Sequence, residues 1–298
     1  MRQGDPLSSK LFIAVLENVF KNIHWEFQGI YVNGHFLTHL RFADDIVLLA
    51  ERPKQLEFML NTLDKESNKV GLEMNVTKTK IMTNSAKIPI KSKDCNIEYV
   101  ENYIYLGKQV SFNKVNNEEE IERRINITWK KFWSLKEILK GDYSIHLKKT
   151  VFDISLLPCL LYGSQTWIFT RKLKQKIQIT QRAMERSILK VRKIHKIRNE
   201  VIRSRTRLTD ALSQALKLKW QWAGHISRYS DQRWTIQATK WKGPIGKRKV
   251  GRPTRRWTDD IIDIAGINWT TIAKNREEWK RMEEAFTQTG IHIQELYN

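Results

Sequence analysis

The sequence predicts an α+β protein in which strands and helices mix in the first third and helices dominate afterwards. Residues 1–115 contain turn dipeptides between short apolar runs, which is typical of antiparallel strands, whereas apolar residues beyond residue 118 recur at helical spacing. The chain has 298 residues, 41% of them hydrophobic, which is enough for a sizeable core and suggests two modules. We therefore expect an antiparallel sheet with packed helices, followed by a mostly helical part.

The first expected elements are a helix and a hairpin. Asp5-Pro6 predicts a helix start, with an N-cap carboxylate and proline at the first helical position. The apolar stripe of this helix recurs every three or four residues and comprises Leu7, Leu11, Val15, Leu16, Val19 and Phe20. A hairpin should follow, because Asn33-Gly34 tolerates the positive φ angles of a type I′ turn.

The next strands should lie on either side of a corner at Ala43-Asp44-Asp45. The residues after it, 46–50, are apolar enough to predict a strand buried on both faces. Pro53 should open a helix that stops at Gly71. Residues 74–82 favour another strand, and residues 103–112 favour either a strand pair or one strand with a glycine bend.

Helices are expected from residue 118 onward. Ile121, Ile125, Trp129 and Phe132 follow a helical period. Further helical segments are predicted at residues 148–170, with a break at Pro158, and at residues 172–195, 200–225 and 276–286. Residues 242–256 are rich in glycine, proline and cations and predict a linker.

Positive charge is concentrated in one block. The formal net charge is +21, from 53 basic and 32 acidic residues. Residues 1–170 carry 23 basic and 20 acidic side chains (+3), residues 171–256 carry 26 and 4 (+22), and residues 257–298 carry 4 and 8 (−4). Because such a block repels itself, a polyanionic partner is expected for residues 171–256.

Candidate nucleic-acid contacts follow from this block. The expected phosphate-binding cations are Arg182, Arg186, Lys193, Arg203, Arg205, Arg207, Arg252, Arg255 and Arg256. Five nearby tryptophans could stack on unpaired bases or belong to the core, where tryptophan is found more often, and these are Trp220, Trp222, Trp234, Trp241 and Trp257.

Several other classes of protein are disfavoured. Cys95 and Cys159 are too few for a disulfide framework or a cysteine-rich zinc site, so we expect neither, in a reducing intracellular setting, nuclear or cytoplasmic. The apolar runs fall far short of the about 20 residues that span a bilayer, and no signal peptide is recognisable, so no membrane association is expected. His195 and His225 lack partners at metal-ligand spacing, and we interpret both as structural or solvated.

Asp44 and Asp45 form the strongest local chemical signal. Two carboxylates held together at a sheet corner repel each other unless a cation neutralises them. Magnesium prefers such hard oxygen ligands and usually shares its coordination sphere with phosphates. Neighbouring side chains of an extended chain point in opposite directions, so the turn has to rotate the two acids if both are to bind the metal. The alternative is an ordinary aspartate-rich turn.

Four motifs occur in a fixed order: Arg2-Gln3-Gly4-Asp5-Pro6-Leu7-Ser8, Phe42-Ala43-Asp44-Asp45, Gly71-Leu72-Glu73-Met74-Asn75 with Lys78-Thr79-Lys80, and Tyr105-Leu106-Gly107. This set resembles the palm of reverse transcriptases, specifically those of non-LTR (LINE-like) retrotransposons. The resemblance continues through residues 157–167, Trp222-Ala223-Gly224-His225 and Gly251-Arg252-Pro253, and so covers nearly the whole chain. It implies a partial palm over residues 1–115, a helical thumb over 116–170 and a basic helical C-terminal region over 171–298.

The resemblance also implies a reaction and its participants. The family adds deoxynucleotides, from dNTP substrates, to a DNA 3′ end on an RNA template, with Mg²⁺ or Mn²⁺. The implied partners are therefore an RNA template and a DNA primer or target. By the same resemblance Asp44 is the metal-binding carboxylate and Asp45 its accessory partner.

Further site residues come from the other motifs. Gln3 and Gly4 would lie against the template and the incoming nucleotide, Lys78 would lie near the triphosphate, and Leu106-Gly107 would hold the primer end. Without the resemblance, Lys78 is simply a solvated lysine and Leu106-Gly107 a strand bend.

The sequence departs from the family pattern at its start. Such polymerases take another metal-binding aspartate from a strand ahead of the Gln3-Gly4 loop, so we expect this chain alone to be inactive. Ser9 stands where proline is usual, and Gln165 where an acid is common. Two alternatives stay open: a noncatalytic RNA- or DNA-binding protein acting through residues 171–256, and an element fragment whose exposed sheet edges prevent a stable fold. The sequence predicts no oligomeric state.

Overall fold

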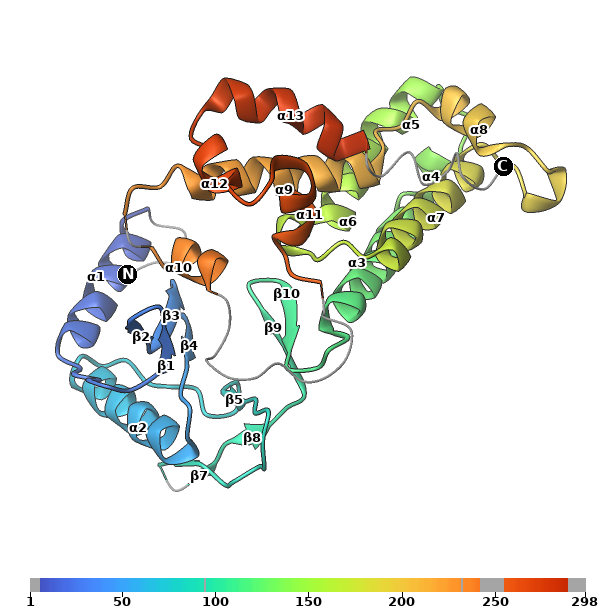
Figure 1. The fold of residues 1–298 in the computed structure, drawn as a ribbon. Helices are drawn as coiled ribbons and strands as arrows, with labels where there is room; N and C mark the ends of the chain where they lie inside the picture. The colour runs from blue at the N-terminus through green and yellow to red at the C-terminus, as the bar shows by residue number, and fades with distance from the viewer. Residues whose placement is uncertain (1–5, 94, 232, 242–254, 289–298) are drawn as a thin grey trace. The chain divides into compact units, whose positions relative to one another are not determined.

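The computed structural model describes residues 6–93, 95–231, 233–241 and 255–288. The chain forms two compact units, residues 1–113 with 240–246, and residues 114–239 with 247–298 (Figure 1). Strands occur in the first unit, and the described residues after Ser111 contain helices and turns only, in agreement with the predicted α+β class.

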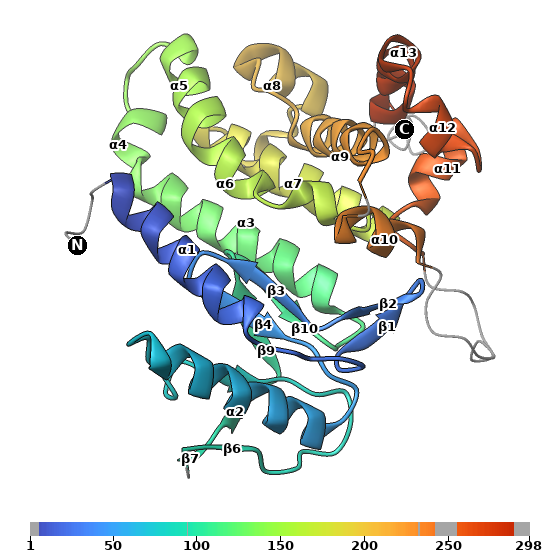
Figure 2. The same ribbon diagram turned by 90° about the vertical axis from the view of Figure 1, so that its left-hand side faces the viewer.

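Two long helices and two hairpins begin the first unit (Figure 2). The helices are α1 (Pro6–Lys21) and α2 (Pro53–Lys69), and the strands between them are β1 (Ile30–Val32), β2 (His35–Leu37), β3 (His39–Phe42) and β4 (Asp45–Leu48). Leu16, Val19 and Phe20 of α1 pack with Met59 and Leu63 of α2 in one core cluster. Side chains of β4 complete this cluster, so the hairpin that carries the two aspartates is anchored to both helices.

The type I′ turn predicted at Asn33-Gly34 is present. Val32 pairs with His35, and Asn33 and Gly34 between them have φ angles of +48° and +93°. Strands β9 (Asn102–Tyr105) and β10 (Lys108–Ser111) are joined in the same way, because Leu106 and Gly107 have φ angles of +47° and +75°. Residues 103–112 therefore lie in a strand pair.

Two predictions about strands are wrong, one in the length of the strand and one in its burial. Of residues 74–82, only Lys80–Ile81 forms a strand, β5, because Asn75 stabilises a turn just before it. The Asn75 side-chain oxygen accepts hydrogen bonds from the Lys78 backbone at 3.0 Å and from the Thr77 hydroxyl at 2.7 Å. Strand β4 is half-buried, since the hairpin has helices on one side only, and is not covered on both faces.

The strands form five separate two-stranded sheets within the described residues. Strands β6 (Lys91–Ser92) and β7 (Cys95–Asn96) pair antiparallel, whereas β5 pairs parallel with β8 (Glu98–Tyr99). A second small core lies beneath them and includes Leu60, Ile81, Ile90 and Ile97. The continuous antiparallel sheet expected from the sequence is thus replaced by hairpins and one short parallel pair.

The second unit is helical. Its elements in chain order are α3 (Asn116–Ser134), α4 (Lys136–Leu139), α5 (Ile145–Val151), the π-helical η1 (Phe152–Leu156), α6 (Leu157–Leu161), the 3-10 helix η2 (Ser164–Thr166), α7 (Arg171–Ile188), the 3-10 helix η3 (Lys193–His195), α8 (Asn199–Thr206), α9 (Ala211–Ser227), α10 (Trp234–Lys240), α11 (Asp259–Ala265), α12 (Trp269–Ile272) and α13 (Arg276–Gln288). The expected break at Pro158 takes the form of the π-helical turn just before it. The segment predicted as helix at residues 200–225 is split by Arg207, which has a φ angle of +52°.

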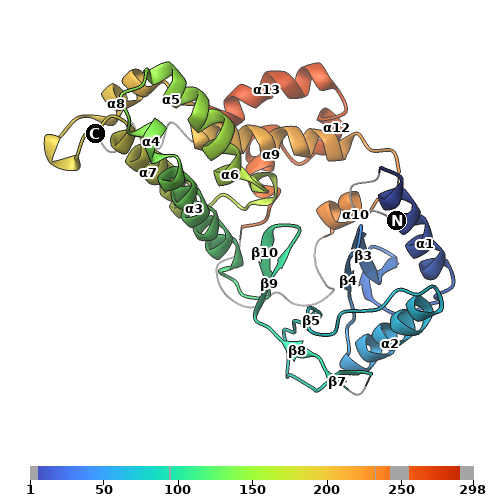
Figure 3. The same cartoon turned by 180° about the vertical axis from the view of Figure 1, so that it is seen from behind.

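One continuous core joins these helices. Helix α3 lies beside α7, and α13 lies along α9 (Figure 3). The rings of Trp220 and Trp279 stack 3.9 Å apart at an angle of 7°, and each indole N–H donates to the other residue's backbone oxygen, at 2.9 and 3.0 Å. The segments that the sequence suggests as thumb and basic region therefore share a core, and the proposed linker lies almost wholly in residues 242–254, outside the described residues.

Two further observations concern the helices and the cysteines. None of the described helices is long and apolar enough to cross a membrane. Cys95 is exposed and Cys159 is partly buried, and both are free thiols in the structure.

Candidate carboxylate site and nucleic-acid interface

The hairpin β3–β4 fixes the position of Asp44 and Asp45. Phe42 pairs directly with Asp45, so Ala43 and Asp44 form a two-residue turn in which Ala43 has a φ angle of +52°. Ile46 packs on the core cluster beneath the hairpin. Because side chains alternate along a strand, Asp45 projects from the opposite face, and both aspartates are exposed.

The nearest strand cation is engaged elsewhere. Arg41 pairs with Ile46 across the hairpin and lies on the face toward α1, where its guanidinium binds Glu17 at 3.0 Å and covers the Phe20 ring at 4.3 Å. Neither Asp44 nor Asp45 has an ion-pair partner in the part of the chain that the structure describes. Two adjacent exposed carboxylates thus remain available to a ligand.

Tyr105 links the second hairpin to this site. Burial raises the pKa of its phenol, and the negative charge of Asp45 raises that pKa further. The phenol of Tyr105 therefore lies within electrostatic range of Asp45, although β9 and β4 belong to different sheets. Leu106-Gly107 directly follows Tyr105 in the chain.

Of the remaining predicted palm residues, only Lys78 lies in the part of the chain that the structure describes. Lys78 is exposed in the turn held by Asn75, and its ammonium forms no ion pair with a described residue. The ammonium of the nearby Lys80 forms an ion pair with Glu98 at 2.5 Å. Gln3 and Gly4 lie outside the described residues.

The donor set at the hairpin is suited to a hard divalent cation. Asp44 and Asp45 supply carboxylate oxygens, the ligand type that Mg²⁺ and Mn²⁺ prefer. Three or more potential metal ligands do not come together anywhere within the described ranges. The hairpin can therefore contribute part of a coordination sphere that phosphate oxygens or further ligands would complete.

Several of the predicted phosphate-binding arginines have internal partners. Arg182 is only 5% exposed and forms ion pairs with Glu185 and, at 2.9 Å, with Asp210. Arg203 binds the same Asp210 at 3.1 Å, and Arg186 donates to the side-chain oxygen of Asn199 at 2.7 Å. These arginines hold α7, α8 and the start of α9 together, so they are not freely accessible to phosphates.

Other cations of the basic block are exposed. Lys193 in η3, Arg205 in α8 and Arg207 directly after α8 form no ion pair with a described residue. Arg255 pairs with Asp263, Arg256 is exposed, and Arg252 lies outside the described residues. The accessible phosphate-binding candidates are therefore concentrated around α8.

The tryptophans divide between core and surface. Trp220 is fully buried, and Trp257 is half-buried and donates to the Gln165 backbone oxygen at 2.8 Å. Trp222, Trp234 and Trp241 are partly exposed. The core interpretation holds for Trp220, and only the surface tryptophans remain available for stacking.

Lys219 is a buried charge that the sequence does not single out. Its ammonium binds Asp260 at 2.8 Å and donates to the Trp167 backbone oxygen at 3.2 Å, and it faces the rings of Phe169 and Trp257. Burial lowers the pKa of Lys219 to about 8, although Asp260 opposes the shift. The ion pair joins α9 to α11. In the sequence, only the apolar residues on either side of Lys219 could have indicated that this lysine is buried.

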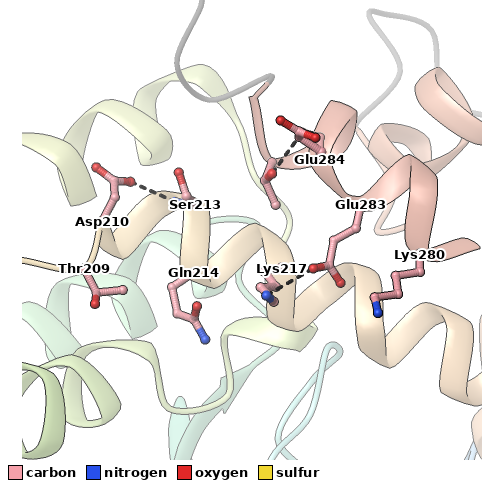
Figure 4. A pocket seen from close by; sticks show the side chains of 9 residues that line it. Thr209, Asp210, Ser213, Gln214, Lys217, Lys280, Glu283 and Glu284 are labelled. Atoms are coloured by element: carbon pink, nitrogen blue, oxygen red, sulfur yellow. Dashed lines mark hydrogen bonds and ion pairs between the residues drawn. The ribbon is translucent and has the colours of Figure 1, made fainter.

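A polar pocket also lies beside α9 and α13 (Figure 4). Its volume is about 370 Å³, and its lining residues are Thr209, Asp210, Ser213, Gln214, Lys217, Lys280, Glu283, Glu284 and Thr287. Lys217 binds Glu283 at 3.2 Å, and Asp210 caps α9 by accepting from the Ser213 backbone at 2.9 Å. Both signs of charge are present and largely paired, so the pocket offers no net attraction for an anion.

Comparison with known proteins places the chain in a family. Residues 1–110 match the family model described as reverse transcriptase (RNA-dependent DNA polymerase). A protein of Caenorhabditis elegans described as transposon-derived and uncharacterised is 37% identical over 267 residues, which is 83% of this chain and 95% of that protein.

Two retrotransposon polyproteins match a shorter stretch. The Pol polyprotein of a type-1 R2 retrotransposable element of Nasonia vitripennis is 39% identical over 74 residues, 25% of this chain and 7% of the polyprotein. That of a type-2 R2 element of Drosophila melanogaster is 39% identical over 79 residues, 26% of this chain and 7% of the polyprotein. Reverse transcriptases act on nucleic-acid templates and primers and use divalent metal ions. The sequence and these similarities together show that the chain belongs to the reverse transcriptases of non-LTR retrotransposons.

Proposed function

We propose that the chain supplies the catalytic hairpin of an RNA-directed DNA polymerase that adds deoxynucleotides to a DNA 3′ end on an RNA template. The observation that carries the proposal is the pair of exposed carboxylates Asp44 and Asp45, which have no ion-pair partner among the described residues and lie at a hairpin tip within the segment that matches reverse transcriptases. On this proposal residues 1–115 are a partial palm, 116–170 a thumb and 171–298 a basic C-terminal region.

In this function Asp44 and Asp45 would hold a divalent ion, Mg²⁺ or Mn²⁺. When bound, the ion would supply positive charge for the phosphoryl transfer. Tyr105 and the Leu106-Gly107 turn support a role in holding the primer end, since Tyr105 lies within electrostatic range of Asp45. Lys78, which forms no ion pair with a described residue, would place a positive charge near the triphosphate of the dNTP, and Gln3-Gly4 would contact template and nucleotide.

We also propose that these 298 residues do not catalyse the reaction by themselves. Two carboxylates alone provide few of the ligands that a pair of metal ions needs for in-line transfer. The further aspartate that the family takes from a preceding strand would complete them.

The test is primer extension on an RNA template with Mg²⁺. The chain is assayed alone and joined to an upstream reverse-transcriptase segment that carries the family's first metal-binding strand. We expect product only from the joined protein, loss of product with Asp44→Ala, and retained product with Glu51→Gln, which removes an exposed acid just beyond β4. Extension by the chain alone would contradict its proposed incompleteness, and extension by the joined protein that survives Asp44→Ala would contradict the assigned function.

A second candidate function is noncatalytic binding of RNA or DNA through the basic block. It is favoured by the exposed cations Lys193, Arg205 and Arg207, which lie close together in the sequence and have no described ion-pair partner. Binding of the full chain to RNA should then weaken steeply as salt rises. Unchanged affinity of a protein lacking the charges of Asp44 and Asp45 would support this function, and salt-insensitive binding would contradict it.

A further inference from the structure

An open hollow lies beside α9, on a different set of residues from the polar pocket of Figure 4. Its volume is about 420 Å³, and it is lined by Gln165, Leu218, Gln221, Trp222, His225 and Arg228. All but Gln165 recur at three- and four-residue spacing on α9 and its C-cap, so they share one helix face. The buried residues of α9, such as Trp220 and Ala223, project from the other side into the core.

Aromatic rings continue from this hollow along the helix. The ring of Trp222 lies 5.8 Å from that of His225, and the ring of His225 lies 4.8 Å from that of Tyr229. The Tyr229 hydroxyl and the His225 Nε2 atom are 2.6 Å apart, which fixes both rings. The guanidinium of Arg233 covers the Tyr229 ring at 4.3 Å, so a cation ends the series.

The hollow offers polar side-chain groups that can bind a flat polar ligand. The Gln221 Nε2 group donates to Glu283 at 3.1 Å, which leaves the amide oxygen of Gln221 as an acceptor. The side-chain amide of Gln165 makes no hydrogen bond to any described residue. Arg228 is anchored by donating to the Ala273 backbone oxygen at 2.9 Å, and its remaining N–H groups donate to no described residue, so they can bind a ligand.

We propose that this hollow binds an unpaired nucleobase of a single-stranded nucleic acid, stacked on Trp222. The indole supplies the π face, the amides of Gln165 and Gln221 supply a donor and an acceptor for the base edge, and Arg228 supplies a cation for the adjoining phosphate. The positive charge of residues 171–256 favours a polyanionic strand over a peptide that is uncharged or has few acidic residues. The inference rests on the nucleic-acid partner of the proposed function, and it does not involve Asp44 or Asp45.

The experiment measures binding of the full chain to a fluorescein-labelled single strand of about ten nucleotides, by fluorescence anisotropy. RNA and DNA strands of the same sequence, an abasic strand of equal length and a duplex are compared. Trp222→Ala should weaken binding of a base-bearing single strand about 5- to 100-fold, because stacking of one base is lost. Binding of the abasic strand should not change, and Trp222→Phe should restore most of the affinity.

Trp133→Ala is the matched control, because it removes another surface tryptophan of the same unit, 49% exposed, on α3. It should leave binding unchanged. If Trp222→Ala lowers the thermal transition, Gln165→Ala replaces it and should weaken binding of the base-bearing strand only. A loss on either RNA or DNA supports the site and identifies the sugar it accepts.

Three results would overturn the proposal: no effect of Trp222→Ala on a base-bearing strand, an equal loss on the abasic strand, or an equal loss from Trp133→Ala. Primer extension by the joined polymerase is measured in parallel. Asp44-dependent extension together with any of these three results would reject the base site and leave the proposed function standing. A Trp222-dependent loss without Asp44-dependent extension would do the reverse.

Discussion

Two sets of charged side chains, one in each unit, are placed in opposite ways. In the first unit Asp44 and Asp45 are exposed at a hairpin tip, without a cation among the described residues. In the second unit Lys219 with Asp260, and Arg182 with Glu185, are buried and paired. A buried pair stabilises packing only while both partners remain, whereas an exposed acid can be removed at little cost to the fold. The charges that serve ligands should therefore be the ones whose loss does not unfold the protein.

The apolar cores differ in the same direction. The first unit has two small clusters around α1, α2 and β5, and part of α1 is left uncovered, since Leu7 is 57% exposed. The second unit has one core that runs from α3 to α13. We infer that the second unit is the more stable and that the first is held together more loosely, which on the proposed function would suit a module that admits a primer, a template and a nucleotide.

The largest stability effect should come from breaking a buried pair. Lys219→Met should lower the free energy of unfolding by about 3–5 kcal/mol, because it leaves the Asp260 carboxylate buried and unpaired. Lys219→Met combined with Asp260→Leu should recover most of that loss. Urea-induced unfolding checks both variants, and a single variant as stable as the wild type would contradict the account.

The same pair predicts a pH dependence. Burial lowers the pKa of Lys219 from its ordinary value of 10.5 to about 8, so between these pH values the unfolded chain holds a proton that the folded chain has released. Stability should consequently rise with pH across this range in the wild type, relative to the Lys219→Met and Asp260→Leu double variant. Unfolding curves recorded at several pH values measure this difference. The same dependence of stability on pH in the wild type and the double variant would contradict a buried lysine.

A smaller effect is expected where α9 meets α13. A Cβ atom on Gly224 would lie 2.5 Å from the Nε1 atom of Trp279, whose ring is fixed by its stack on Trp220. Gly224→Ala should therefore lower the free energy of unfolding by about 1–3 kcal/mol, because the added methyl group overpacks this contact. Gly34→Ala is not a suitable control, because Gly34 has a positive φ angle. The control is Ala238→Gly at an exposed position in α10, which measures the ordinary effect of helix propensity.

The sequence predicted what short-range rules determine. The turns at Asn33-Gly34 and Leu106-Gly107 and the helix start at Pro6 follow from dihedral preferences of a few residues. The two acids were found because they sit in such a turn. Asn75 shows the limit of these rules, since its side chain forms a turn within residues 74–82, which were predicted to form a strand.

Long-range pairing could not be predicted from the sequence. The partner of Lys219 is 41 positions away, and Trp220 and Trp279 are separated by 59. Arg182 and Arg203 were assigned to nucleic acid on charge alone, since nothing local indicates that Asp210 lies between them. Gln165 enters the hollow beside Trp222 only through the folded core, so that site had no signal beyond an isolated tryptophan.

The exposed cations should affect binding and not stability. Arg205→Gln with Arg207→Gln should leave the thermal transition nearly unchanged and reduce the salt dependence of RNA binding by about two phosphate contacts. Lys274→Gln, an exposed lysine at the opposite end of the unit's sequence, provides the control. Equal effects of the control and the double variant would mean that the charge is used without regard to position.

The smallest stability effect should be at the hairpin tip. Asp44→Ala should change the free energy of unfolding by no more than about 0.5 kcal/mol, because the side chain is exposed and has no described partner. Removing one of two adjacent like charges could even stabilise the turn slightly. Thermal unfolding of the purified chain measures this difference.

We infer that the exposed acids serve the reaction and that the buried charges serve the fold. Asp44→Ala in the joined polymerase tests it most directly when stability and primer extension are measured on the same sample. We predict an unchanged unfolding transition and a loss of extension of at least about a hundredfold. Extension that persists, or a loss that is matched by unfolding, would contradict the account.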